Sequence, residues 1–309
     1  MEVLLQQIIN GLVLGSMYAL IALGYTMVYG IIQLINFAHG EVLMVGALTA
    51  WSIIGLMQSS MPGTPGWIIL IIAMLIACVV AATLNFVIEK VAYKPLRNSP
   101  RLAPLITAIG MSILLQTLAM IIWKPNYKPF PTLLPSQPFN LGGAFITWTQ
   151  IMILSVTAVS LAVLMWLVHY TRIGRAMRAT AENPRVAGLM GVKPDMVISA
   201  TFIIGAILAA IAGVMYASNY GTAQHTMGFL PGLKAFTAAV FGGIGNLGGA
   251  VLGGVLLGLI EAIGSGYIGT LTGGLLGSHY TDIFAFIVLI IVLTLRPSGL
   301  LGERVADRA

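Results

Sequence analysis

Long, uninterrupted runs of apolar residues recur along the chain. They cover residues 5–30, 41–57, 67–88, 102–123, 148–168, 196–217, 247–263 and 283–295. Because a helix of about 20 residues crosses the roughly 30 Å hydrocarbon layer of a bilayer, most of these runs are long enough to span a membrane. The runs do not alternate with a period of two, which argues against a transmembrane β-barrel. The pattern therefore predicts an all-α polytopic membrane protein.

Composition supports this class and excludes others. Of the 309 residues, 58% are hydrophobic and only 8% are charged, whereas a soluble domain carries about 25% charged residues. An ordinary soluble enzyme, a disordered protein and a secreted disulfide scaffold are therefore excluded. Glu2 is the only charge before the first apolar run, so we do not expect a signal peptide. We predict one transmembrane domain over residues 1–309.

The basic residues predict the orientation of the chain. Most of them lie in three loops, namely Lys90, Lys94, Arg97 and Arg101, then Arg172, Arg175, Arg178, Arg185 and Lys193, and finally Arg296, Arg304 and Arg308. The positive-inside rule places these loops in the cytoplasm. The first apolar run then starts outside, which predicts a periplasmic N-terminus and a cytoplasmic C-terminus. The net charge of +6 thus reflects topology, and we expect no nucleic-acid partner.

This orientation requires an even number of crossings within residues 219–280. The stretch 233–245 is apolar but short, and it is followed by the glycine-rich stretch 242–249. We interpret 233–245 and 247–263 as two linked short helices, forming either a re-entrant hairpin or two thin crossings. Irregular backbone at membrane depth is tolerated only when it is buried in protein or lines an aqueous cavity. This broken pair is therefore a candidate element of a transport pathway.

Three glycine pairs have the small-xxx-small spacing that lets helices approach closely. They are Gly11/Gly15, Gly249/Gly253 and Gly254/Gly258. Each pair fits either a packing seam between helices or simply a thin helix.

Polar residues between the first two apolar runs allow two interpretations. Asn36, Gly40 and Glu41 are typical of a helix start, where Asn caps and a carboxylate complements the positive helix end. Alternatively, Asn36, His39 and Glu41 line a gate or a water-filled path, because charges within the membrane tend to face a partner or a cavity. Asn246 in the glycine-rich break, and Glu261 near the end of its apolar run, are further pathway candidates. Glu261 also fits a position at the membrane interface.

The chain shows no sign of catalysis or of its own energy source. It contains no Walker A motif, no cluster with metal-ligand spacing and no assignable nucleophile–base pair. Residues 243–248 match G-x-G-x-x-G, but they lie between apolar runs and not in a βαβ unit. We therefore expect no enzyme and no cofactor bound by this chain.

The basic loop 171–195 predicts a short helix of its own. Asn183 can cap this helix, Pro184 suits its first position and Gly191 suits its end. Val186, Leu189 and Met190 have the spacing of one apolar face. Such a helix either docks onto a partner or lies on lipid headgroups.

Three segments resemble the LivH-type permeases of branched-chain amino acid ABC transporters. They are INFAHGEVLMVGA at 35–47, GRAMRATAENPRVAGLMGV at 174–192 and FGGIGNLGGAVLGGVLLGLIE at 241–261, and the similarity extends over residues 6–302. The resemblance implies a type II ABC importer-like helical bundle in the bacterial inner membrane. It also makes 171–195 a coupling loop that meets an ATPase, through Glu182, Asn183, Pro184, Arg185, Val186, Leu189, Met190 and Gly191.

The resemblance further implies the partners. These are a homologous second permease of the LivM type, two cytoplasmic ATPase subunits of the LivG and LivF type that use ATP and Mg, and a periplasmic amino-acid-binding protein. The expected function is ATP-driven import of leucine, isoleucine and valine by alternating access. Alternatives are a related ABC importer for amides, urea or other amino acids, a channel or ion-coupled secondary carrier, and an intramembrane enzyme. Sparse charge inside the middle apolar runs argues against the carrier.

Overall fold

The computed structural model describes residues 2–97, 99–100, 102–135, 137–273, 281–296 and 298–302. Both chain ends, together with Arg101, Arg304 and Arg308 of the basic loops, lie outside the described residues.

Helices dominate the described part of the chain. The long ones are α1 (Glu2–Ile32), α2 (His39–Ser60), α3 (Gly66–Ile88), α4 (Leu102–Trp123), α5 (Trp148–Tyr170), α8 (Pro194–Tyr220) and α10 (Leu247–Leu271). The shorter ones are α6 (Arg172–Glu182), α7 (Pro184–Leu189), α9 (Phe229–Gly242), α11 (Thr281–Leu295), a π-helical turn η1 (Glu89–Tyr93) and a 3₁₀ turn η2 (Lys94–Leu96). Among the described residues, seven helices are long and apolar enough to cross a membrane. The predicted polytopic helical class is confirmed.

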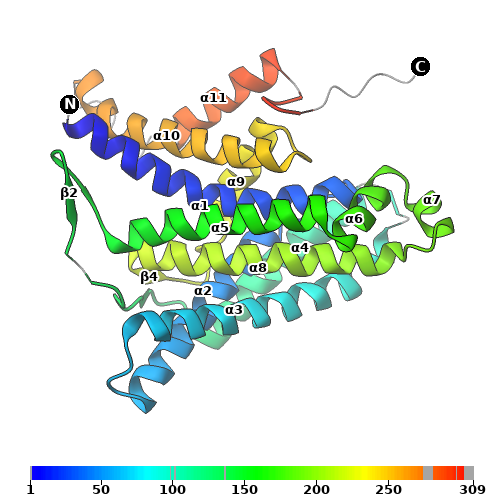
Figure 1. Ribbon diagram of the computed structural model, residues 1–309, viewed down its shortest axis with the longest axis horizontal. Coiled ribbons are helices and arrows are strands. Elements are labelled where there is room, and N and C mark those ends of the chain that lie inside the picture. The colour runs from blue at the N-terminus through cyan, green and yellow to red at the C-terminus, as the bar shows by residue number, and fades with distance from the viewer. Residues whose placement is uncertain are drawn as a thin grey trace.

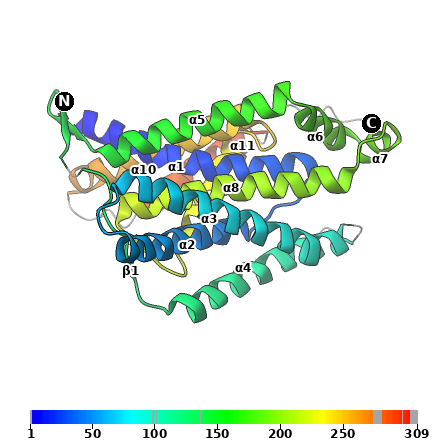
Figure 2. The ribbon, with the colours of Figure 1, turned by 60° about the horizontal axis from the view of Figure 1, so that its bottom comes forward.

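Four short strands pair antiparallel near one end of the bundle. They are β1 (Lys128–Pro129) with β4 (Thr222–Ala223), and β2 (Phe139–Leu141) with β3 (Ala144–Ile146). The axes of the long helices are roughly aligned, and α6 and α7 lie at the end opposite to the start of α1 (Figure 1). The buried centre consists of α1, α2 and α8, whereas α4 and α5 expose most of their apolar surface. In Figure 2, α4 runs along the outside of the bundle. Such exposed apolar helices suit contact with hydrocarbon.

All three glycine pairs are packing seams. A Cβ on Gly15 would lie 2.7 Å from Cα of Val255, and one on Gly254 would lie 2.7 Å from Cα of Ala19, so α1 and α10 touch backbone to backbone. Gly249 and Gly253 instead bring α10 against α9, where their added Cβ atoms would collide with Gly242 and Ala238. Only residues without a side chain allow this approach.

Two helices begin inside the bundle instead of at its ends. After α1, residues 33–38 turn back along that helix, and the ring of His39 packs against Gly24. Helix α2 starts there, at a buried position, and meets the start of α9. A Cβ on Gly40 would lie 2.5 Å from the carbonyl oxygen of Gly228. The segments 33–38 and 224–228 thus place irregular backbone in the interior, which protein packing tolerates.

The broken pair differs in part from the prediction. The break is confirmed at residues 243–246, where Gly243 has φ +105° and Gly245 has φ +99°, a region that favours glycine. Helix α9 is short, but the expectation that its partner is also short is wrong. Helix α10 has 25 residues and can span a bilayer, because the helix continues through Gly264, Ser265 and Gly266, where the apolar run is interrupted.

The two helices of the pair run antiparallel, as the successive glycine contacts show. The chain after α11 returns to the same turn, where the amides of Leu300 and Leu301 donate to the carbonyls of Phe241 (3.0 Å) and Gly242 (2.9 Å). Helix α9 is shorter than a membrane span, so the even number of crossings within residues 219–280 stays a prediction.

Candidate functional site

The loop 171–195, which the resemblance predicts to be a coupling loop and which keeps that name below, contains the short helix that its sequence predicts. Oδ1 of Asn183 accepts from the amides of Arg185 (3.0 Å) and Val186 (3.1 Å), and Pro184 is the first residue of α7. Helix α7 ends at Leu189, one residue earlier than expected, and Gly191 follows with φ +86°. The local prediction is confirmed because the cap, the proline and the glycine each act on backbone close to them in the chain.

The apolar face of α7 points away from the bundle. Leu189 is 88% exposed, Met190 is 81% exposed and Val186 is 53% exposed, whereas Ala187 is buried against the protein. Glu182 and Arg185 beside them are also not buried. Helix α6 anchors the loop through the buried Met177. The loop thus holds a small apolar surface at the far end of the bundle, surrounded by charge.

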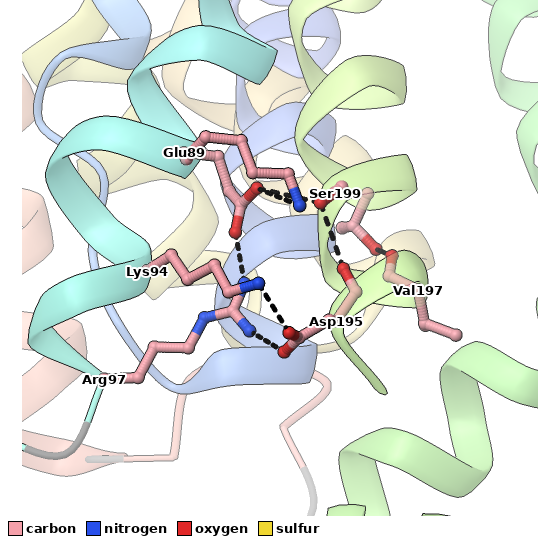
Figure 3. Close-up of polar contacts among 8 residues, drawn as sticks. Glu89, Lys94, Arg97, Asp195, Val197 and Ser199 are labelled. Carbon is pink, nitrogen blue, oxygen red and sulfur yellow. Dashed lines mark hydrogen bonds and ion pairs between the residues drawn. The ribbon is translucent and has the colours of Figure 1, made fainter. Parts of the chain in front are cut away.

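A network of charged side chains lies where the coupling loop enters α8 (Figure 3). Asp195, in the first turn of α8, pairs through Oδ1 with Arg97 (2.5 Å) and through Oδ2 with Lys94 (2.8 Å). Arg97 also forms an ion pair with Glu89, whose side chain is fully buried. The second oxygen of Glu89 accepts a hydrogen bond of 2.8 Å from Ser199.

Sequence reasoning missed this network because it treated residues 90–101 only as a positive loop. A signal was available: Glu89 directly follows a long apolar run and precedes a cluster of cations. A carboxylate in that position needs a cationic partner if it is buried.

Asn36, His39 and Glu41 lie together where α2 begins. Asn36 does not cap α2, whose N-cap is Ala38 without a side-chain bond. Instead, Oδ1 of Asn36 accepts from the amide of Ala38 (3.1 Å) and from the hydroxyl of Tyr93 (2.7 Å). The His39 ring meets the ring of Tyr25 edge-on at 4.7 Å. The prediction that a helix starts at this point of the chain is therefore confirmed, but the prediction that Asn36 caps it is wrong.

Glu41 is buried and faces α4. Its Oε1 accepts from Oγ of Ser112 (3.1 Å) and from Nε2 of Gln116 (2.7 Å). Among the described residues, neither Oε2 of Glu41 nor Nδ2 of Asn36 has a hydrogen-bond partner. A buried polar atom without a partner costs about 1–3 kcal/mol. The start of α2 is therefore a polar point in a largely apolar interior.

Glu261 lies elsewhere, between α1, α9 and α10. It pairs with Lys234 at 2.7 Å and accepts from the hydroxyl of Tyr18 at 2.9 Å. Glu261 also borders a pocket of about 260 Å³, which it shares with Asn10, Gln150 and other polar side chains. Its side chain is largely buried and paired, and both the pathway and the membrane-interface interpretation of Glu261 stay predictions.

Asn246 lies at the end of the bundle that carries the coupling loop. It caps α10 by accepting from the amide of Gly249 (3.0 Å), and it donates to the carbonyl of Leu301 (3.0 Å). It borders a cleft of about 1600 Å³ that Arg178 and Arg296 also line. The five predicted pathway residues thus occupy three separate places, and only Asn36, His39 and Glu41 form a cluster.

The described residues contain no group of His, Cys, Asp or Glu side chains arranged to hold a metal ion. The features of the described part that remain as functional candidates are the polar start of α2, the charged network around Glu89 and the exposed apolar face of α7.

Comparisons with known proteins agree over nearly the whole chain. A family model described as "Branched-chain amino acid transport system / permease component" matches residues 7–293. The chain is 45% identical over 304 residues to the high-affinity branched-chain amino acid transport system permease protein BraD of Pseudomonas aeruginosa. It is equally similar to LivH of Escherichia coli, and each alignment covers 97% of this chain and 96% of the relative.

A more distant relative matches only part of the chain. The autoinducer 2 import system permease protein LsrC of Escherichia coli is 34% identical over 123 residues, covering 39% of this chain and 34% of LsrC.

Proposed function

Because the chain belongs to the family of branched-chain amino acid transport system permease components, we propose that it forms the membrane pathway of an ATP-driven importer of leucine, isoleucine and valine. The observation that carries the proposal is the 45% identity to permease proteins over 97% of the chain. The exposed apolar face of α7 supports it, because a helix of this kind needs a partner surface.

The proposed complex supplies what this chain lacks. Two ATPase subunits of the LivG and LivF type bind ATP and Mg and receive α7, while a LivM-type permease forms the other half of the pathway. A periplasmic binding protein delivers the amino acid at the opposite end. The assembly lies in the bacterial inner membrane, with the N-terminus of this chain periplasmic and its C-terminus cytoplasmic. The basic residues around the coupling loop support this orientation.

The proposed mechanism is alternating access. Closure of the ATPase pair displaces α7, which is joined to the bundle through α6 and α8. The bundle then shifts between outward-open and inward-open states, and ATP and the binding protein bias this equilibrium by their different contacts with each state. The cluster of Asn36, His39 and Glu41 supplies a few polar groups at the point where α2 and α9 meet.

Uptake by vesicles tests the proposal. The reconstituted complex should accumulate leucine and valine only with ATP, and should not accumulate urea or ribose. The purified subunit alone should accumulate neither amino acid. Accumulation by the subunit alone without nucleotide would contradict the proposal, and selective uptake of urea would redirect it to a related importer.

The docking role of α7 has a separate test. Replacing Val186, Leu189 and Met190 with Asp should abolish both uptake and copurification of the ATPase subunits. These side chains are exposed, so the bundle itself should still fold. Phe145→Asp is the control, because it places an aspartate on an exposed apolar position of β3, at the other end of α5. Wild-type copurification of the triple variant would exclude the docking role.

A further inference from the structure

One face of α3 and its continuation carries a polar side chain at every fourth position. These residues are Asn85, Glu89, Tyr93 and Arg97, and we refer to them as the polar row. They extend from the last turns of α3 through η1 and η2. Asn85, Glu89 and Tyr93 are buried in a largely apolar bundle, so their contacts require explanation.

Three members of the polar row bind α8 in reverse order. Nδ2 of Asn85 donates to the carbonyl of Phe202 at 2.7 Å. Glu89 accepts from Ser199, and Arg97 pairs with Asp195 at the start of α8. The polar row therefore fastens α3 to the helix that directly follows the coupling loop.

The π-helical turn keeps the polar row on one face. In a continuous α-helix, residues four apart drift by roughly 40° around the axis, because 3.6 residues make one turn. A π turn closes with i→i+5 bonds and is wider, so it offsets this drift. The turn spans Glu89–Tyr93, in the middle of the polar row. Turns of this kind are frequent at functional sites.

Tyr93 connects the polar row to a different segment. Its hydroxyl donates to Oδ1 of Asn36 at 2.7 Å, and the same oxygen accepts from the amide of Ala38, directly before α2. The Tyr93 ring packs against Phe202 of α8 at 5.5 Å. Tyr93 thus contacts both α8 and the irregular segment 33–38 directly before α2. A displacement of α8 can be passed to this segment through these side-chain contacts.

The two carboxylates of the network are held differently. Glu89 is completely buried and is compensated by Arg97 and Ser199, and more distantly by Lys90 at 3.9 Å, because an uncompensated buried charge is strongly unfavourable. The side chain of Asp195 is 56% exposed and is shared between Arg97 and Lys94 (Figure 3). The contacts of the network are therefore fixed on the α3 side by burial. On the α8 side, where the coupling loop ends, Asp195 can exchange its contacts between two cations.

We propose that Glu89 is a positioning residue for transport. It fastens the π turn, which also carries Tyr93, to Arg97 and Ser199, so that displacement of the coupling loop is transmitted by this turn and the Tyr93 hydroxyl to segment 33–38 and the start of α2. The proposal rests on the proposed function, because it presumes that an ATPase moves α7. It adds a route from the loop to the interior that the docking helix alone does not supply.

The test uses Glu89→Gln and Tyr93→Phe in the complete reconstituted complex. Glu89→Gln preserves shape and a hydrogen-bond acceptor but removes the charge that holds Arg97. Tyr93→Phe removes only the hydroxyl that contacts Asn36. In each variant we expect leucine uptake to fall about tenfold while ATP hydrolysis stays near the wild-type rate. A tenfold change is a typical size for coupling between two sites. More ATP would then be hydrolysed per leucine imported.

The double variant provides a second criterion. If both residues act along one route, Glu89→Gln with Tyr93→Phe should lower uptake little more than either change alone. A merely structural role would instead lower hydrolysis, uptake and yield together. Glu2→Gln is the matched control, since it removes an exposed carboxylate at the far end of α1 and should leave the ratio unchanged.

An unchanged ratio of hydrolysis to uptake in both single variants would overturn the inference, as would additive losses in the double variant. If Glu89→Gln prevents assembly, Tyr93→Phe decides by itself, because it leaves all charges in place. Failure of the proposed function is distinguishable, because the wild-type complex itself would then show no ATP-dependent uptake of leucine.

Discussion

The described part of the bundle contains two clusters of charged residues, and they join different kinds of segment. Lys234, Glu261 and Tyr18 connect α9, α10 and α1, three regular helices. Glu89, Arg97 and Asp195 connect a π turn, the loop before α4 and the first turn of α8. The first cluster is enclosed by helices that glycines bring into backbone contact. The second opens towards the coupling loop.

The difference shows what each cluster contributes. An ion pair between closely packed helices cannot rearrange without separating backbones, so Lys234 and Glu261 hold a fixed framework. A network that ends on a half-exposed carboxylate with two cationic partners can exchange contacts at little cost. We therefore assign stability mainly to the first cluster and movement mainly to the second.

The largest expected effect is that of Lys234→Ala. It leaves Glu261 buried without its cation, and removing one partner of a buried pair costs about 3–5 kcal/mol. The midpoint of thermal unfolding in detergent should fall sharply. The variant combining Lys234→Met with Glu261→Gln should be much closer to wild type, since the charge is gone while an acceptor remains for Tyr18. Equal losses in both variants would show that the charge pair is not the source of stability.

A smaller effect is expected where glycines bring the framework helices together. Gly15→Ala places a methyl group 2.7 Å from Cα of Val255, and overpacking of this kind costs about 1–3 kcal/mol. Gly55→Ala in α2 is the matched control, because its added methyl group meets nothing within 4 Å. Thermal unfolding should separate the two variants. If Gly55→Ala is equally destabilising, the α1–α10 seam has no special role.

The smallest effect on stability is expected for Asp195→Asn. Its carboxylate is half exposed, and exposed ion pairs contribute about 0–1 kcal/mol. The unfolding midpoint should therefore hardly change, even though the change touches the same network as Glu89. A loss as large as that of Lys234→Ala would remove the distinction between a fixed cluster and an adaptable one.

Features that depend on neighbouring residues were predictable from sequence. The helical class followed from the lengths of the apolar runs, and α7 followed from Asn183, Pro184 and Gly191. The glycine spacing identified the positions of close packing but not the helices they pack against. The spacing is a property of one helix, whereas a packing contact is formed by two helices. The ion pair of Glu261 was not predicted for the same reason, since its cation lies on another helix, 27 residues earlier in the chain.

The order of apolar runs, basic loops and glycines along the chain was sufficient for a membrane bundle with a short capped helix in the loop 171–195, since bilayer thickness and local capping act on consecutive residues. Tertiary structure alone decided that α2 begins in the interior against α9, and that Glu89 meets Ser199 across 110 residues. It also decided that Tyr93 reaches Asn36. These contacts arise because buried polar groups must find partners wherever packing brings them, and no local pattern records where that is.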